Sequence, residues 1–175
     1  LDKNRIEKYQ TETQIRNWNQ NEYIKLRVCG QGSLFFIELI YNIEKAELFA
    51  VKKPNCINNS EIQKLINREI FNYSNLNYPL LPKLCGLIEG KFNKSLVIQF
   101  INGQTLEKID KNQLNENEKM TIIFELMLII NYFHKNNFVY RDLKPNNVMI
   151  DKNKTAYLID FDRLKKLTKT TENEQ

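Results

Sequence analysis

The chain has 175 residues, of which 42% are hydrophobic and 27% charged; this balance suits one core or two small lobes that need no disulfide support. The net charge is +5, but acidic residues are interleaved with the lysines and the longest apolar stretch, residues 122–130, is short, so we expect neither a nucleic-acid-binding surface nor a membrane segment within this chain. The three cysteines, Cys29, Cys56 and Cys85, have no C-x-x-C spacing, which argues against a disulfide framework or a zinc ribbon and favours a reducing, cytoplasmic location.

Residues 1–22 are expected to form a polar N-terminal extension, and strands are predicted to follow it. Apolar and charged residues alternate over residues 24–28, and a second apolar run lies around residues 35–40. A third strand is predicted at Leu48–Lys52. A period of two residues places Ala50 and Lys52 on one face of that strand together with Leu48, so a lysine shares a face with apolar side chains.

A helix is predicted to begin at Ser60, because Ser60 and Gln63 have the spacing of a capping box. Its apolar stripe consists of Ile62, Leu65, Ile66 and Tyr73. Glu69 falls on the same stripe, and a buried carboxylate requires a partner, for which Lys52 is the obvious candidate. The alternative, in which Glu69 reaches solvent from the edge of the stripe, is equally open on this pattern alone.

A hairpin and then a long helix are predicted next along the chain. Residues 84–89 and 95–101 have the character of two paired strands. Asn115 and Glu118 form a plausible helix cap, and an apolar stripe follows over Ile122–Phe133. The chain therefore changes from strands to helix after this hairpin.

Short strands are predicted around a polar loop in the last third of the chain. The apolar runs 138–139 and 148–150 bracket the loop, and a last strand is expected at residues 156–159. This order of elements indicates an α+β fold with two lobes and a waist near residue 102.

The polar loop carries the residue types that phosphoryl transfer needs. It presents a carboxylate at Asp142, a cation at Lys144 and an amide at Asn147, and the last strand brings a second carboxylate at Asp160. Such chemistry requires oxygen ligands for Mg²⁺, a base that orients a hydroxyl and a cation on the transferred phosphate. An ordinary polar turn explains Asp151–Lys154 well, but it explains this loop poorly because several residue types coincide.

These motifs resemble those of a eukaryotic protein kinase domain of the serine/threonine type. The loop Tyr140–Asn147 (YRDLKPNN) is similar to the catalytic loop H-R-D-L-K-P-x-N, and Asp160–Asp162 is similar to the metal motif D-F-G. Phe49–Lys52 resembles the V-A-I-K strand, and Gly30–Ser33 resembles the start of the glycine-rich loop. Glu69 stands where the family places the glutamate of helix C.

The resemblance implies a bilobal protein-kinase-like fold of the α+β class. We expect a five-stranded antiparallel N-lobe with helix C over residues 23–101, followed by the first part of a helical C-lobe over residues 102–175. The sequence runs thirteen residues past Asp162, which is too short for an activation segment and the substrate-binding helices. The expectation is therefore an incomplete catalytic domain that is inactive in isolation.

The resemblance also implies roles for individual residues. Lys52, held by Glu69, would bind the α- and β-phosphates of ATP, Asp142 would orient and deprotonate the substrate hydroxyl, and Lys144 would neutralise charge on the γ-phosphoryl group. The implied magnesium ligands are Asn147 and Asp160. The implied ATP-binding residues are Cys29, Gly30, Gln31, Gly32, Ser33, Ile37, Ala50, Lys52, Ile98, Gln99, Phe100, Ile101 and Met149. Lysine at position 144 implies a protein substrate with serine or threonine.

Departures from the family pattern leave two alternatives open. Phe35 stands at the third glycine of the loop and Asp162 at the glycine of the metal motif, and both favour a pseudokinase that acts by binding nucleotide or protein. The stretch Leu158–Arg163 also resembles that of some small-molecule phosphotransferases of the kinase type. Tyr140 replaces the histidine of the catalytic loop, but its ring can pack on the aromatic residue of the metal motif equally well.

Overall fold

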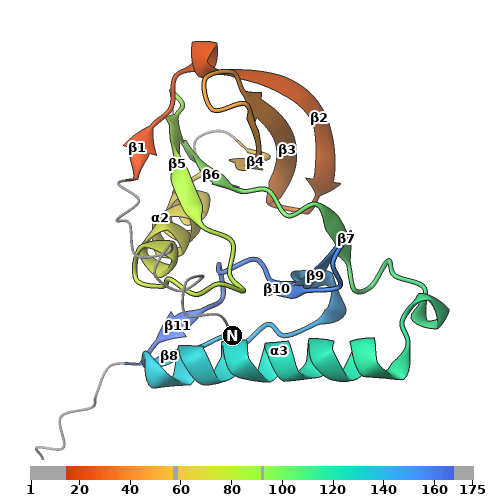
Figure 1. Cartoon of the computed structure of the whole chain (residues 1–175). Helices are drawn as coiled ribbons and strands as arrows, with labels where there is room; N and C mark the ends of the chain where they lie inside the picture. The colour runs from red at the N-terminus through yellow and green to blue at the C-terminus, as the bar shows by residue number, and fades with distance from the viewer. Residues whose placement is uncertain (1–14, 57–58, 92, 168–175) are drawn as a thin grey trace, which may run out of the picture. The chain divides into compact units, whose positions relative to one another are not determined.

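The computed structural model describes residues 15–56, 59–91 and 93–167. These residues form two compact units, and the division lies between Asn102 and Gly103. No helix in this described part is long and apolar enough to cross a membrane. Each unit has its own sheet and its own principal helix (Figure 1).

The first unit is built on a six-stranded sheet in the order β1-β5-β6-β4-β3-β2 (Figure 1). The strands are β1 (Arg16–Asn17), β2 (Tyr23–Gln31), β3 (Phe35–Asn42), β4 (Glu47–Pro54), β5 (Leu84–Glu89) and β6 (Lys94–Gln99), and the single turn η1 (Gln20–Glu22) precedes β2. Strands β2 to β6 pair antiparallel as the sequence predicts. The sixth strand, β1, pairs parallel with β5 and comes from the segment that was expected to be a polar extension.

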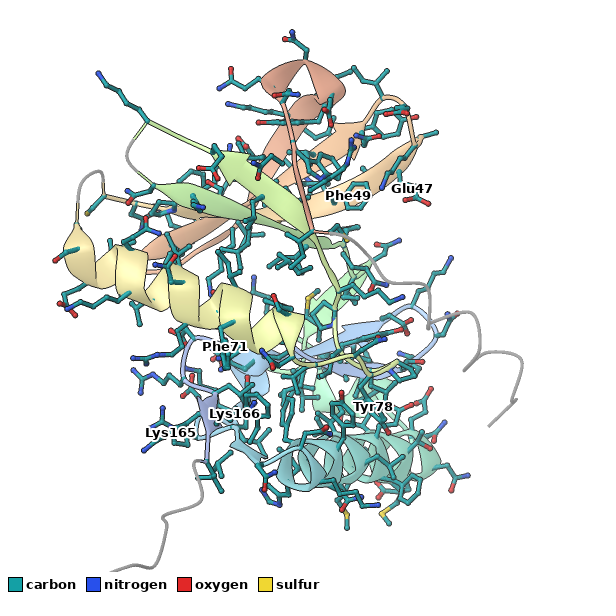
Figure 2. The ribbon with its side chains drawn as sticks, turned by 90° about the vertical axis from the view of Figure 1, so that its left-hand side faces the viewer. Glu47, Phe49, Phe71, Tyr78, Lys165 and Lys166 are labelled. Atoms are coloured by element: carbon teal, nitrogen blue, oxygen red, sulfur yellow. The ribbon has the colours of Figure 1, made fainter. Side chains whose placement is uncertain are left out.

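Trp18 explains why this polar segment joins the sheet. Its ring is buried and meets Phe49 edge-on, with 4.9 Å between the ring centroids. Figure 2 labels Phe49 among the side chains of this sheet. The indole Nε1–H donates to the carbonyl of Cys85 at 3.2 Å, and the backbone N–H donates to that of Leu87 at 2.7 Å. Gly86 leaves the necessary space, because a Cβ atom there would lie 2.3 Å from Trp18 Nε1.

The two faces of this sheet carry different side chains. One face carries the hydrophobic core formed by Trp18, Tyr23, Ile40, Phe49, Val51, Ile88 and Val97. The strand register places Ala50 opposite Ile98 and Lys52 opposite Leu96 on the other face. The helix α2 (Ser60–Ser74) packs against β5 and β6. Alternation along β4 therefore directs Phe49 and Val51 into the core and directs Lys52 to the opposite face.

The predicted capping box at the start of α2 is wrong by one residue. Asn59 is the N-cap, and its side-chain oxygen accepts from two backbone N–H groups of the first turn at 2.9 and 3.3 Å. Ser60 is the first helical residue, and the side chain of Gln63 donates to Asn67 at 3.0 Å. Asparagine is at least as good an N-cap as serine, so the residue before Ser60 takes this position.

The second unit consists of one long helix and short strands. Its elements are β7 (Gly103–Thr105), η2 (Lys111–Gln113), α3 (Glu116–Lys135), β8 (Phe138–Val139), η3 (Pro145–Asn147), β9 (Val148–Asp151), β10 (Ala156–Leu158) and β11 (Lys165–Lys166). The strands form a three-stranded sheet in the order β10-β9-β7 and a pair of β11 with β8. The predicted cap of α3 is confirmed, because Asn115 and Glu118 form a reciprocal capping box.

Glu125 ties α3 to the small sheet. The residue lies within the apolar stretch of the helix, and its half-buried carboxylate accepts the N–H of Ala156 at 2.7 Å. Burial raises the pKa of this carboxyl above its usual range. The apolar side chains Ile122, Ile129 and Phe133 are buried along the same helix. The helix thus positions β10, which leads directly to the acidic motif at Asp160.

Gly86→Ala should detach β1 from the sheet. The added Cβ would overlap the Trp18 ring and the carbonyl of Arg16, and overpacking of this kind costs about 1–3 kcal/mol. Urea unfolding should show this loss, and the emission of Trp18, the only tryptophan, should shift to longer wavelength. Gly30→Ala is the control, since a Cβ atom there would make only ordinary contacts. An unchanged emission maximum in the Gly86 variant would contradict this account of β1.

Candidate active site

In the first unit, β4 and α2 bring Lys52 and Glu69 together. Lys52 Nζ lies 3.0 Å from Oε1 and 2.8 Å from Oε2 of Glu69. Lys52 is 6% exposed and Glu69 is 1% exposed, so the carboxylate does not reach solvent and the predicted pairing is present. Two charges removed from water are tolerated only when each compensates the other. The pair therefore links the helix to the strand.

Several of the implied ATP-binding residues lie on the face of the sheet that carries Lys52. Ile37 is opposite both Lys52 on β4 and Gly30 on β2, and Ala50 is opposite Ile98 on β6. Cross-strand partners point to the same side of a sheet. Gly30, Ile37, Ala50, Lys52 and Ile98 therefore form a single surface that is apolar except for the lysine.

The glycine turn between β2 and β3 is held by a residue that sequence reasoning missed. The side-chain amide of Asn55 donates to the carbonyls of Gly32 at 2.7 Å and Ser33 at 3.1 Å. The backbone N–H of Asn55 donates to the carbonyl of Leu34 at 2.8 Å, and within the turn the N–H of Gly32 donates to the carbonyl of Phe35. An asparagine just after a strand has no distinctive pattern, so only the structure identifies it.

The remaining implied ATP-binding residues lie at different places in the two units. Cys29 Sγ donates to the carbonyl of Ile37 at 3.6 Å and is exposed. The N–H of Gln99 donates to the carbonyl of Lys83 at 2.8 Å, and its side-chain oxygen accepts the N–H of Lys83 at 3.3 Å. Met149 belongs to the second unit, where it lies on β9. Gln31 is the last residue of β2, and Phe100 and Ile101 directly follow β6.

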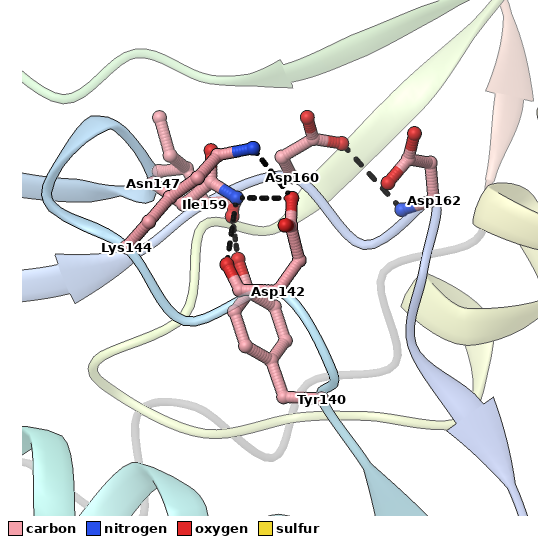
Figure 3. A network of polar contacts seen from close by, with 7 residues as sticks. All are labelled: Tyr140, Asp142, Lys144, Asn147, Ile159, Asp160 and Asp162. Carbon is pink, nitrogen blue, oxygen red and sulfur yellow. Dashed lines mark hydrogen bonds and ion pairs between the residues drawn. The ribbon is translucent and has the colours of Figure 1, made fainter.

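In the second unit, the loop before β9 holds the carboxylate of Asp142 between two donors (Figure 3). Lys144 Nζ and Asn147 Nδ2 each lie 2.8 Å from Asp142 Oδ2. Asn147 Nδ2 also donates to the backbone carbonyl of Asp142 at 3.0 Å. The hydrogen bond from the Lys144 ammonium is the largest cause that holds the pKa of Asp142 below its usual range. The carboxylate is therefore ionised at neutral pH.

Tyr140 connects this loop to the segment that carries Asp160. Its hydroxyl donates to the carbonyl of Ile159, and the N–H of Ile159 donates to the carbonyl of Asn147 at 2.8 Å (Figure 3). Burial, together with the negative charges of Asp160 and Asp142, raises the pKa of Tyr140 well above its usual range. The hydroxyl thus stays protonated, and it remains a hydrogen-bond donor to the carbonyl of Ile159.

Aromatic packing supports the same connection. Tyr140 stacks on Phe133 of α3 with 5.8 Å between centroids and meets the edge of Phe161 at 6.5 Å. Phe133 and Phe161 also contact each other in a T-shaped arrangement at 6.0 Å. The expectation that a tyrosine at position 140 packs on the aromatic residue of the metal motif is confirmed.

The backbone strain of the acidic motif falls on Asp160 and not on Asp162. Asp160 has a φ of 67° and Arg141 has a φ of 63°, whereas Asp162 is absent from the positive-φ residues of the described chain. The N–H of Asp162 donates to Asp160 Oδ1 at 3.5 Å. Replacement of the family's glycine by Asp162 therefore adds a carboxylate without placing a side chain on a left-handed backbone.

Asn147 and Asp160 have the donor chemistry that suits magnesium. Asn147 uses its amide nitrogen toward Asp142, so its oxygen is the atom suited to ligate a cation, and Asp160 adds a carboxylate. Proteins bind Mg²⁺ through one or two carboxylates together with substrate phosphates and water.

A match to the protein kinase domain extends over residues 23–175. The chain belongs to the protein kinase family. It is 28% identical over 142 residues to the carbon catabolite-derepressing protein kinase of Candida glabrata, covering 79% of this chain and 23% of that protein. It is 31% identical over 165 residues to the serine/threonine-protein kinase OXI1 of Arabidopsis thaliana, covering 86% of this chain and 39% of that protein.

The fold agrees with this family assignment. The structure of the twitchin kinase fragment of C. elegans, which includes kinase and immunoglobulin domains, matches with a TM-score of 0.79 at 24% identity. The match covers 93% of this chain and 38% of that one. The chain thus spans between about a quarter and two-fifths of the length of these similar proteins.

Glu69→Gln should destabilise the protein strongly, because it leaves the Lys52 charge buried without a carboxylate. Breaking a buried ion pair in this way costs about 3–5 kcal/mol, which urea unfolding would measure. The double variant Lys52→Met/Glu69→Leu should recover most of the loss, since apolar side chains of similar volume replace both charges. Glu61→Gln on the same helix removes an exposed pair with Lys64 and should leave the stability almost unchanged, because solvent screens such a pair. A double variant no more stable than Glu69→Gln would contradict the assignment.

Lys144→Met should raise the pKa of Asp142 toward its ordinary value of 3.8, because the ammonium is the main cause of the lowered value. The pKa of Asp142 is lower in the folded protein than in the unfolded chain, so the ionised carboxylate stabilises the fold at pH values above its unfolded pKa. This contribution is lost as the pH falls through the folded-state pKa. Carbon-13 NMR of the aspartate carboxyl groups would report the titration. Lys152→Met is the control, and an Asp142 titration that is the same in both variants would refute the contact.

Proposed function

We propose that this chain is the nucleotide-binding and catalytic-loop part of a serine/threonine protein kinase that transfers the γ-phosphate of ATP to protein hydroxyl groups. The observation that carries the proposal is the arrangement around Asp142. An ionised carboxylate is held by an ammonium and an amide, and the loop that holds it is hydrogen-bonded to Ile159, the residue directly before Asp160. Family membership and the serine/threonine kinases among the relatives support this choice.

Asp142 has the role of orienting the incoming hydroxyl. Its lowered pKa makes it a weak base, so it accepts a hydrogen bond from the serine or threonine hydroxyl and receives the proton only as the new bond to phosphorus forms. The contacts from Lys144 and Asn147 fix the carboxylate in one orientation. Positioning of this kind is the main contribution that a protein can make to phosphoryl transfer.

The cationic groups in this proposal act on the phosphates. Lys52, oriented by Glu69, would contact the α- and β-phosphates, and Lys144 would approach the γ-phosphoryl group. Asn147 and Asp160 would hold Mg²⁺, which when bound supplies positive charge to the phosphate oxygens. The apolar surface of Ile37, Ala50 and Ile98 would take the adenine ring.

A protein that binds nucleotide without transferring phosphate is the second candidate. The aromatic ring of Phe35 lies over Lys52, and Asp162 adds a negative charge beside the implied metal ligands. Both features would weaken the binding of a nucleotide with its metal. Transfer of phosphate distinguishes the two candidates, and its appearance on a sugar but never on a protein would instead indicate a small-molecule phosphotransferase.

Asp142→Asn should abolish phosphotransfer and largely spare ATP binding, whereas Asp160→Asn should weaken the magnesium-dependent part of ATP binding. Loss of a positioned base lowers the rate by about 10²- to 10⁴-fold. The measurements are transfer of radiolabelled phosphate to a serine-containing protein and calorimetric titration of ATP with and without Mg²⁺. Both measurements use the protein in the form in which the cell produces it.

Asp110→Asn serves as the matched control. Asp110 is an exposed carboxylate that caps η2 in the same unit, and asparagine caps equally well, so its activity should equal that of the wild type. Full transfer activity in either the Asp142 or the Asp160 variant would refute the assigned roles. Magnesium-dependent binding of ATP to the wild type without transfer to any substrate would favour the second candidate.

A further inference from the structure

Phe35 lies directly over the buried ammonium of Lys52. Lys52 Nζ is 4.9 Å from the centroid of the Phe35 ring, which is within the range of a cation–π interaction. Phe35 pairs with Pro54 and Ile37 pairs with Lys52. Alternation along both strands therefore places Phe35 and Lys52 on the same face of the sheet.

Both sides of this contact are held in place. Lys52 is fixed by Glu69 at 2.8 and 3.0 Å. Phe35 is the first residue of β3, its carbonyl accepts the N–H of Gly32 at 2.8 Å, and Asn55 binds the two carbonyls inside the same turn. The ring is half-buried. The hydrogen bonds of the turn therefore fix the backbone next to Phe35, and the ion pair fixes Lys52.

The position of the ring affects access to Lys52. With Phe35 in place, Lys52 is 6% exposed, so almost none of its surface is open to an incoming phosphate oxygen. A ligand whose phosphates bind Nζ must displace the ring and lose the cation–π contact. A ligand without phosphates, which needs only the apolar surface around Ala50 and Ile98, does not have to displace the ring.

We propose that Phe35 is a positioning residue that covers the Lys52 ammonium and selectively weakens the binding of nucleotide phosphates. This inference rests on the proposed function, because it assigns Lys52 to the phosphates of ATP. Cation–π contacts of desolvated groups correspond to about a 2- to 30-fold change in affinity. Phe35 therefore sets how strongly the site discriminates between a nucleotide and its nucleoside.

Calorimetric binding of ATP and of adenosine to the wild type, Phe35→Ala and Phe35→Leu tests this inference. Phe35→Ala should bind ATP about 2- to 30-fold more tightly than the wild type and should bind adenosine equally well. Phe35→Leu, which keeps bulk but has no aromatic face, should bind ATP with intermediate affinity. Equal ATP affinity in the wild type and the alanine variant would overturn the inference. An equal gain for adenosine, or a leucine variant identical to the wild type, would also overturn it.

A second measurement needs no nucleotide and separates this inference from the proposed function. The rate at which an amine-reactive reagent modifies Lys52 can be followed by mass spectrometry, with Lys53 as the internal control. Lys53 pairs with Glu38 on the other face of the sheet, so its rate should not change. Phe35→Ala should increase the modification of Lys52 several-fold, and an unchanged rate would show that the ring does not cover the ammonium. Faster modification in a protein that binds no ATP would refute the proposed function and leave the contact standing.

Discussion

The buried ion pair of Lys52 and Glu69 fixes the positions of both elements that carry it. A slip of one residue along β4 would turn Lys52 toward the face that carries the Trp18 core and away from Glu69. A rotation of α2 by one residue, about 100°, would move Glu69 away from the strand and bring another side chain into its place. Only one register of the strand and one rotation of the helix satisfy both charges. The remaining face of the sheet, with Ala50 and Ile98, takes its position from this choice.

In the second unit, the side chains for which we propose catalytic roles lie on a loop and not on a strand or helix. The side chains of Tyr140 and Asn147 donate hydrogen bonds to the backbone carbonyls of Ile159 and Asp142, and the N–H of Ile159 donates to the carbonyl of Asn147. The aromatic cluster around Phe161 supports the loop from α3. Asp142 and the segment that carries Asp160 therefore stand on a framework of backbone carbonyls and buried rings, and the loop itself supplies the donors to the Asp142 carboxylate.

Local patterns predicted the strands of the first unit and the cap of α3 because alternation and capping depend on neighbours in the sequence. For Glu69 the pattern left two alternatives equally open, a pair with Lys52 or exposure at the edge of the stripe, and the structure shows the pair. The loop Tyr140–Asn147 predicted phosphoryl-transfer chemistry because a carboxylate, a cation and an amide coincide within its eight residues.

Features that depend on distant parts of the chain could not be predicted in this way. Trp18 joins the sheet because Gly86, far along the sequence, leaves room for its ring. Asn55 holds the glycine turn across the end of a hairpin. The N-cap of α2 could not be predicted to the residue either. Asn59 and Ser60 are both good N-cap residues, and nothing in the local sequence decides between them.

The left-handed backbone at Arg141 and Asp160 has a consequence for how this sequence can vary. A non-glycine residue held in that region costs about 1–3 kcal/mol, and glycine would remove most of that cost. Selection for folding stability alone would therefore replace Asp160 with glycine and delete the carboxylate that the acidic motif presents. Any variant of this domain chosen only because it survives heat should be checked first at these two positions. At Asp160, greater stability and loss of the carboxylate come from the same substitution.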